Sequence, residues 1–254
     1  MNITGNTIFI PGATSGIGLA LAVALEEQGN TVIVGGRRAE LLDAIAADHP
    51  AIDTVVIDTT SPESISDASA QVIRHHPDLN VLVAMAGIMK AEDWHNPAGF
   101  LEAAEAVITT NVLGPVRLVA AFVEHLQSCP DSTIMTVSSG LAHTPLKWTT
   151  SYNASKAAIH QLSEGLRLQL ADTSVKVVEL VPPAVQTELL PGGSTNPDAM
   201  PLDEFIAEVV AILKAEPDVR EVLVEKVKFL RYSEVRGDYD QVVALLNGLA
   251  PPAN

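Results

Sequence analysis

Residues 7–18 read Thr7-Ile8-Phe9-Ile10-Pro11-Gly12-Ala13-Thr14-Ser15-Gly16-Ile17-Gly18. The apolar run 7–10 predicts a buried strand, and the amphipathic stretch 16–28 predicts a helix that ends at Gly29 and Asn30. Three glycines between a strand and a helix let the chain turn sharply and let a pyrophosphate approach the backbone, with the helix N-terminus facing it. We interpret this turn as a phosphate-binding loop. Three residues, not one, separate its first two glycines, unlike the usual dinucleotide fingerprint.

The same alternation of apolar run and amphipathic stretch recurs along the chain. Nearly continuous apolar runs are typical of parallel strands that helices cover on both faces. We predict an α/β fold: a Rossmann-type doubly wound sheet of about seven parallel strands. The expected strands are 7–10, 31–34, 54–57, 81–85, 133–137, 176–180 and 221–224. The expected helices after the first are 39–48, one that starts at Ser61-Pro62, 115–127, 152–170, 202–215 and 238–249.

Length and patterning predict one domain over residues 1–254. The least regular stretch is 185–201, which contains Pro191-Gly192-Gly193-Ser194 and Asn196-Pro197. Because it follows a strand of the predicted sheet, we expect it to form a substrate loop or lid. A surface loop without a role is the alternative.

Charge and composition exclude several classes of partner. Lys and Arg total 15 against 31 Asp and Glu, a net charge of -16, so nucleic acid and anionic membranes are not expected partners. The longest apolar run, 81–89, is too short to cross a bilayer, so no transmembrane helix is expected. A single cysteine, Cys129, and a start without a leader pattern predict a cytoplasmic protein.

The end of the second predicted strand indicates which dinucleotide is bound. It reads Val34-Gly35-Gly36-Arg37-Arg38 and holds no acid that would bind a ribose 2'-hydroxyl. Two guanidinium groups stand where a 2'-phosphate would lie, and Ser15 can add a hydroxyl. We therefore predict NADP(H) over NAD(H). The alternative is that Arg37 and Arg38 form a solvated surface pair.

Tyr152 and Lys156 are the candidate reacting groups. Four residues apart on a predicted helix, they lie on one face, where the ammonium stabilises phenolate and favours acid–base chemistry. This pattern alone is more often a packed ring and a solvated charge. Ser139 lies thirteen residues before Tyr152, at the end of the fifth predicted strand, and the glycine loop comes earlier still. Together they favour an acid–base site at Tyr152 and Lys156.

The chain resembles the short-chain dehydrogenase/reductase family, whose first turn reads Thr-Gly-x-x-x-Gly-x-Gly. The resemblance covers almost the whole chain and includes, in the family's order and approximate spacing, Asn111, Ser139, Tyr152 with Lys156, and Pro183 with Thr187. Residues 175–187 and 224–233 further resemble a bacterial oxidoreductase subgroup named after D-alanine lipoteichoic acid operons.

The resemblance implies an enzyme that moves hydride between the cofactor and a small carbonyl or secondary-alcohol substrate. Tyr152 would give or take the proton, Ser139 would polarise the substrate oxygen, and Lys156 would also hold ribose hydroxyls. Asn111 would anchor a water that relays protons to Lys156; the alternative is an asparagine bonded to its own helix. A non-catalytic dinucleotide-binding sensor or scaffold is the second reading of function.

The resemblance also supplies the remaining cofactor contacts. Asp58 and Thr59 would lie near the adenine, although a turn or N-cap role for Asp58 stays open, and the Val185 backbone with the Thr187 hydroxyl would hold the nicotinamide carboxamide. The expected cofactor-binding residues are Gly12, Thr14, Ser15, Gly16, Ile17, Gly18, Arg37, Arg38, Asp58, Thr59, Ala86, Gly87, Tyr152, Lys156, Pro183, Val185 and Thr187.

Three residues depart from the family pattern: Pro11, Ala84 and Met85. They lack the polar groups that tie two strand ends together in the family, so we expect weaker cofactor binding but not its loss. Family members pair through helices that here contain 111–127 and 152–170, which implies a homodimer or homotetramer.

No metal is expected, because the seven histidines show no ligand spacing. Cys129 has no base near it in sequence and is not expected to act as a nucleophile. By position alone, the substrate pocket would be lined by Leu141, His143, Trp148, Leu189 and Leu190.

Overall fold

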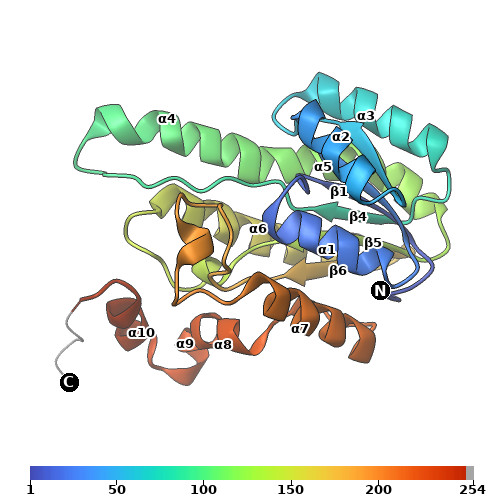
Figure 1. The fold of residues 1–254 in the computed structure, drawn as a ribbon. Coiled ribbons are helices and arrows are strands. Elements are labelled where there is room, and N and C mark those ends of the chain that lie inside the picture. Colours follow the sequence, from blue (N-terminus) through green and yellow to red (C-terminus); the bar gives the residue numbers. More distant parts are fainter. Residues whose placement is uncertain (250–254) are drawn as a thin grey trace.

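The computed structural model describes residues 1–249 and contains a seven-stranded parallel sheet (Figure 1). The strand order is β3-β2-β1-β4-β5-β6-β7, so the chain winds outward in both directions from β1 and β4. This confirms the predicted doubly wound Rossmann-type fold. The strands are β1 (Thr7–Pro11), β2 (Thr31–Gly36), β3 (Ile52–Val56), β4 (Val81–Ala84), β5 (Ser132–Val137), β6 (Val175–Leu180) and β7 (Glu221–Val222).

Helices cover both faces of the sheet, and each face has its own apolar cluster. One cluster joins the sheet to α1, α2 and α7, with Leu21, Leu42 and Phe205 fully or almost fully buried. The other joins it to α3 and α5, with Phe122 against Phe9 of β1. The helices are α1 (Gly16–Glu26), α2 (Ala39–Asp48), α3 (Pro62–His75), α4 (Pro97–Ile108), α5 (Gly114–Ser128), α6 (Thr150–Gln169), α7 (Leu202–Ala215), α8 (Glu225–Arg231), α9 (Ser233–Arg236) and α10 (Tyr239–Leu246).

Local signals in the sequence set several helix ends. Gly29 adopts φ +83° just after α1, as the predicted stop requires. The Ser61 hydroxyl accepts a hydrogen bond from the Ser64 amide, and Pro62 opens α3. Strand β3 begins two residues before the predicted run, and β7 has two residues where four were expected.

Helix α4 was not predicted and continues through a π-helical turn, η1 (Thr109–Leu113), into α5. The run Pro97–Ser128 is long and apolar enough to cross a membrane by length and composition. Within the fold it instead packs against β4, β5, α3 and α6 and supplies buried residues to the core. No uninterrupted apolar run marks Pro97–Ser128 in the sequence, and only its second half, 115–127, was predicted as a helix.

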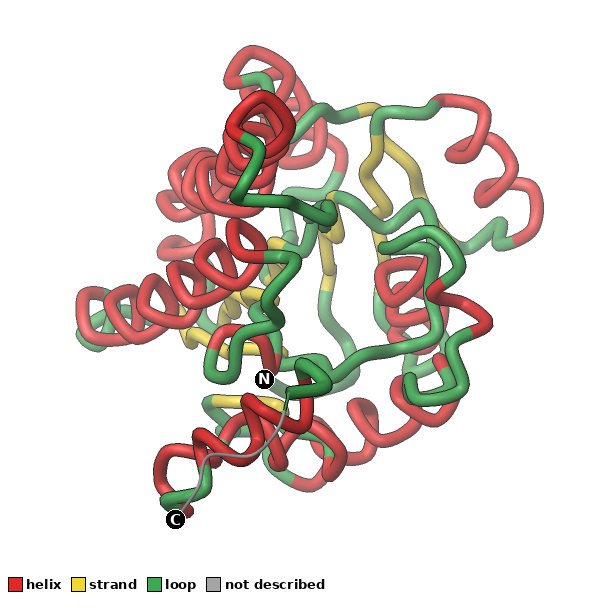
Figure 2. The backbone as a smooth tube through the Cα atoms, turned by 90° about the vertical axis from the view of Figure 1, so that its left-hand side faces the viewer, coloured by secondary structure: helices red, strands yellow, loops and turns green. Residues whose placement is uncertain are grey.

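The loops that follow the strands gather at one edge of the sheet, which faces the viewer in Figure 2. Segment 185–201 belongs to this edge, and backbone hydrogen bonds join its first residues to its last ones. Val185 pairs with Met200, the Gln186 amide donates to the Met200 carbonyl at 2.9 Å, and the Met200 amide donates to Ala184 at 2.8 Å. The segment is therefore an ordered loop whose two ends are fixed together.

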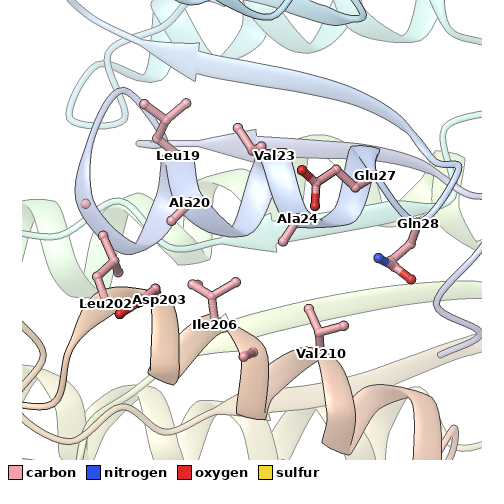
Figure 3. A pocket seen from close by; sticks show the side chains of 12 residues that line it. Leu19, Ala20, Val23, Ala24, Glu27, Gln28, Leu202, Asp203, Ile206 and Val210 are labelled. Carbon is pink, nitrogen blue, oxygen red and sulfur yellow. The ribbon is translucent and has the colours of Figure 1, made fainter.

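Helix α7 follows this segment and faces α1 across an apolar groove (Figure 3). Ala20 and Ala24 of α1 lie opposite Ile206 and Val210 of α7. Gly16, the first residue of α1, also lines the groove. The start of α7 and the glycine turn are thus neighbours.

Candidate active site

The glycine turn brings the ends of β1 and β4 together. Gly12 adopts φ +88°, and a Cβ on it would lie 2.6 Å from Cα of Ala86, so only glycine fits. The Gly12 amide donates to the Gly35 carbonyl at 2.8 Å, which ties the turn to β2 as well. Gly16 adopts φ +57° and faces Thr187, whose Cβ would be 3.4 Å from an added methyl group. The predicted residues of three separate loops therefore meet here.

The N-terminus of α1 is available to an anion. Ser15 is the N-cap residue, and its side chain makes no cap hydrogen bond, so the amides that follow it at Gly16 and Ile17 point into the turn. Gly18 is required by packing, because a Cβ would lie 2.7 Å from Cα of Ala13. The turn has the backbone donors and the close approach that a pyrophosphate needs.

Two arginines follow the end of β2, as predicted, and both side chains are exposed. Arg38 donates to the Thr14 hydroxyl of the glycine turn at 3.3 Å. Arg37 is close enough to Asp58 to lower its pKa. Positive charge therefore stands at the outer end of the turn, beside the loops that follow β2 and β3.

Asp58 serves a turn, the structural role that the sequence left open beside adenine binding. Its Oδ1 accepts from the Thr60 amide at 2.9 Å and from the Thr60 hydroxyl at 2.7 Å. Burial raises the pKa of Asp58, but these two bonds and Arg37 outweigh it and hold the pKa below its ordinary value. Thr59, its neighbour, is buried against Gly114. The turn fixes the Asp58 carboxylate close to Arg37.

Tyr152, Lys156 and Ser139 come together at the carboxyl end of β5. All three are buried, and the Ser139 side chain is near enough to the Tyr152 hydroxyl to lower its pKa. Lys156 lies 5.6 Å from the centre of the Tyr152 ring and donates to the Val137 carbonyl at 2.7 Å. Ser138 has a buried hydroxyl without a partner among residues 1–249, so Ser139 is the serine that faces the tyrosine.

Burial shifts both ionisable groups of this site. It raises the pKa of Tyr152 to about 12, against the opposing effect of the nearby Ser139 side chain. It lowers the pKa of Lys156 to about 8, against the attraction of the Glu179 carboxylate. At neutral pH the tyrosine is therefore a protonated acid beside a charged ammonium.

Asn111 lies in the π-helical turn η1 and is buried. Its Oδ1 accepts from the Ile88 amide at 2.8 Å, and its Nδ2 donates to the Ile88 carbonyl at 2.9 Å and to the Ser155 hydroxyl at 3.0 Å. These partners lie outside its own helix, which removes the alternative. A Cβ on Gly87 would lie 3.4 Å from Asn111 Oδ1 and 3.7 Å from Lys156 Nζ, so the three residues converge.

Comparisons with known proteins agree with this geometry. Residues 6–197 match the family described as short chain dehydrogenase. The chain belongs to the short-chain dehydrogenase/reductase family. It is 36% identical to an uncharacterized oxidoreductase, DltE, of Bacillus subtilis strain 168, with 97% of this chain and 98% of that protein covered, as the predicted subgroup requires.

Solved structures show the same fold. A short chain dehydrogenase from Burkholderia cenocepacia J2315 in complex with NADP has a TM-score of 0.82 at 28% identity and covers 99% of this chain and 100% of its own. An alcohol dehydrogenase from Thermococcus sibiricus complexed with 5-hydroxy-NADP has a TM-score of 0.77 at 26% identity, covering 86% and 95%. This short-chain dehydrogenase is thus an oxidoreductase with a fold that binds a nicotinamide dinucleotide.

The three departures of this short-chain dehydrogenase from the family pattern are packed among apolar groups. Pro11 and Ala84 are buried, and Ala84 belongs to the apolar cluster over β1 and β5. Met85 packs against the cluster on the opposite face. Apolar contact therefore takes the place of polar links at these strand ends, while Gly12 and Ala86 keep the ends close.

The proposed pocket residues fall into two groups. Trp148 and Leu189 are 41% and 43% exposed, and Leu141 is half-buried beside Ser139, to whose hydroxyl its amide donates. His143 differs: its ring lies edge-on to that of His160 at 4.7 Å, in a polar cluster with Glu179. That cluster was not predicted, because its members are far apart in sequence.

Glu92 was also missed by the sequence analysis of this short-chain dehydrogenase. It is buried, and its Oε2 accepts from the Ser151 amide at 3.0 Å and from Trp94 Nε1 at 2.9 Å. The carboxylate thus sits at the N-terminus of α6, next to Tyr152, where the helix dipole favours a negative charge. No motif marks this residue, since its partner on α6 is 59 positions away.

Proposed function

We propose that this protein is an NADP(H)-dependent reductase or dehydrogenase that interconverts a carbonyl and a secondary alcohol. The observation that carries the proposal is the convergence of the buried side chains of Ser139, Tyr152 and Lys156, on the loop edge that also holds the glycine turn. A bound nicotinamide ring would supply or accept the hydride. The residues of this chain would manage the proton and orient the substrate.

In reduction, Ser139 donates a hydrogen bond to the substrate oxygen and polarises it, and the Tyr152 hydroxyl gives that oxygen its proton. In oxidation the tyrosine takes the proton back. The raised pKa of Tyr152 keeps the proton on the phenol before the reaction. The Lys156 ammonium would stabilise the phenolate that forms once the proton has moved to the substrate. Asn111 would link Lys156 to solvent through a water next to Gly87.

The preference for NADP(H) is supported by Arg37, Arg38 and Ser15 at the outer end of the glycine turn. Two structural relatives carry NADP or an NADP derivative. Guanidinium groups suit a phosphate dianion, and no carboxylate ends β2 to repel it. The substrate would be a small molecule held between Ser139 and segment 185–201, which would close over it.

Self-association as a homodimer or homotetramer in the cytoplasm belongs to the same proposal. Helices α4, η1 and α5 carry a row of exposed apolar side chains, and a second copy of this chain is the occupant that the family resemblance implies. The row consists of Leu101, Ile108, Leu113 and Val116, with exposures of 39–57%.

The experiment is NADPH consumption with a panel of ketones and aldehydes, comparing wild type with Tyr152→Phe. Removal of the acid is expected to lower kcat by about 10²–10⁴-fold. Tyr239→Phe, in α10 and outside the site, is the matched control and should retain wild-type turnover. Undiminished turnover by Tyr152→Phe would reject the catalytic assignment.

A dinucleotide-binding sensor or scaffold is the second candidate, favoured by the departures at Pro11, Ala84 and Met85. Binding of NADPH without turnover of any panel member would support this candidate over an enzyme. Turnover that depends on Tyr152 would reject it.

A further inference from the structure

The face of α6 that carries the reacting groups continues into a buried polar cluster. Tyr152, Lys156 and His160 are spaced four residues apart, so they lie on one face of the helix. Nδ1 of His160 contacts both carboxylate oxygens of Glu179, at 2.9 and 3.1 Å. The Glu179 side chain has no exposed surface. A fully buried carboxylate therefore contacts the residue that lies one helical turn from the site lysine.

The adjacent strand contributes a second carboxylate that has its own cation. Glu221 of β7 is the register partner of Glu179 on β6, and its Oε1 is 4.0 Å from His160 Nδ1. Arg231 of α8 donates to both Glu221 oxygens, at 2.8 and 3.0 Å. Burial raises the pKa of Glu221, but Arg231 outweighs it and holds that pKa below its ordinary value. The charge of Glu221 is thus neutralised inside the cluster.

Glu179, in contrast, has no Lys or Arg bonded to it within residues 1–249. Lys156 is the complementary case, a buried ammonium whose hydrogen bond goes to the Val137 carbonyl and not to a carboxylate. Helix α6 brings the two near each other, because Lys156 bonds Val137 of β5, whose register partner Leu180 follows Glu179 on β6. The Glu179 carboxylate raises the pKa of Lys156 and so opposes the effect of burial on it.

A divalent metal ion is the other occupant to consider. Ligand atoms of His143, His160, Glu179 and Glu221 all lie within 4.8 Å of one another, and Nε2 of His143 is buried without a partner in the described part of the chain. An ion would compete with Arg231 for Glu221, and it would add two positive charges beside Arg231 and Lys156. Charge balance therefore favours the cluster as it stands.

We propose that Glu179 is a positioning residue for Lys156: its carboxylate, held in place by His160, is the buried counter-charge that keeps the Lys156 ammonium protonated in the reactive site. This inference rests on the proposed function for the chemical role of Lys156. The electrostatic coupling between the two side chains can be measured without turnover, so the two proposals can fail separately.

The direct test is an NMR titration of protein labelled with [13Cε]lysine, in wild type and Glu179→Gln. The Lys156 signal is assigned by its disappearance in Lys156→Arg. Loss of the counter-charge is expected to lower the titration midpoint of Lys156 by about 0.5–1 pH unit. The control is Glu164→Gln, also on α6, whose carboxylate pairs with Arg167 and is 44% exposed, and it should leave the midpoint unchanged. Equal Lys156 midpoints in wild type and Glu179→Gln would overturn the proposal.

The pH profile of kcat/KM provides the functional readout. In Glu179→Gln the decline at high pH is expected to begin at lower pH, with a larger effect on kcat than on KM for the carbonyl substrate. Glu179→Asp keeps the charge and should move the profile back toward wild type. A profile unchanged in Glu179→Gln would count against the proposal, whereas a shifted Lys156 titration without Tyr152-dependent turnover would reject only the proposed function.

Two further arms cover the remaining outcomes. If Glu179→Gln does not fold, the reciprocal measurement compares wild type with Lys156→Met, both labelled with [13Cδ]glutamate. Loss of the ammonium should move the titration of the Glu179 carboxyl to higher pH. An unchanged midpoint would overturn the proposal. Calorimetric titration with ZnCl2 tests the competing occupant. One equivalent of Zn²⁺ bound by wild type and lost in His143→Ala would identify a metal site and overturn the proposal.

Discussion

Gly12 is restricted in two independent ways, by its backbone conformation and by its neighbour. Its φ of +88° disfavours any side chain, and the space for a Cβ is filled by Ala86 at 2.6 Å. Gly29 shares the first restriction, with φ +83°, but a Cβ there would meet nothing within 4 Å. The two glycines therefore form a matched pair.

The first prediction uses this pair. Gly29→Ala is expected to lower the free energy of unfolding by about 1 kcal/mol, because alanine is strained at positive φ. Gly12→Ala carries the same strain, and overpacking adds about 1–3 kcal/mol. Urea unfolding measures both, and NADPH titration should show weakened binding only in Gly12→Ala. Equal losses of stability would contradict the close approach of the two strand ends.

The second prediction concerns the exposed arginine beside Asp58. Arg37→Ala should raise KM for NADPH by about tenfold or more and KM for NADH much less, because only NADPH carries the 2'-phosphate. Steady-state kinetics with both cofactors measures this. Lys90→Ala, an exposed cation that follows β4, is the control and should change neither value. Equal effects of Arg37→Ala on both cofactors would remove the claim for NADP(H).

Single residues differ in how far sequence alone could place them. Tyr152 and Lys156 were predictable because a helix fixes the geometry of residues four apart. The environment of His160 was not, since its partner Glu179 comes from a strand 19 positions later and depends on how helix and sheet pack. For Asp58 the sequence left a turn role and adenine binding open; its bond to Thr60 shows the turn role, and adenine binding stays a prediction.

At the scale of elements, the strands and the doubly wound parallel sheet followed from apolar runs and their spacing, whereas the order of the strands comes from the structure. Helix α4 was missed although Asn96-Pro97 is a start signal of the same kind as Ser61-Pro62, because its apolar residues form no clean stripe. The π-helical turn at Asn111 has no sequence signature either, yet it directs the Asn111 amide toward Ile88 and Ser155.

The third prediction concerns segment 185–201. Its base is closed by Val185 and Met200, and Thr187 lies against Gly16 of the glycine turn, so bound cofactor should restrain it. Hydrogen exchange measured by mass spectrometry is expected to slow across this segment when NADPH is added. Peptides from α10 serve as the control and should not change. Unaltered exchange in 185–201 would favour a surface loop without a role.

At the scale of the whole molecule, stability should depend on pH through His143. Burial lowers the pKa of His143 to about 4, helped by the positive charge of Arg231. Between pH 6.5 and 5 the unfolded chain binds a proton at this histidine that the folded chain does not, so folded stability falls as pH falls.

The fourth prediction follows from this loss of stability as the pH falls. His143→Gln should reduce the loss of unfolding free energy between pH 6.5 and 5 by about 1 kcal/mol, a figure that allows for partial exposure. Urea unfolding at both pH values measures it. His95→Gln, an exposed histidine paired with Asp93, is the control. An equal pH dependence in wild type and His143→Gln would show that His143 takes up its proton in the folded state.

The fifth prediction concerns self-association through α4, η1 and α5. Val116→Asp places a charge in the exposed apolar row of an already acidic chain and is expected to shift the protein to monomer. Val235→Asp, at an 82% exposed position in α9, should leave the oligomer intact. Light scattering after size exclusion measures both. An oligomer unchanged by Val116→Asp would place the interface elsewhere.

The facing pair Glu179 and Glu221 affects the order in which the sheet can fold during synthesis of the chain. Two like charges at opposed positions of neighbouring strands repel, and the guanidinium that relieves them belongs to Arg231, fifty-two positions after Glu179. During ribosomal synthesis, strands β1 to β6 can therefore pair early, whereas stable pairing of β7 with β6 requires α8 to have emerged from the ribosome. A nascent chain released before that point would expose this edge to quality control by chaperones and proteases.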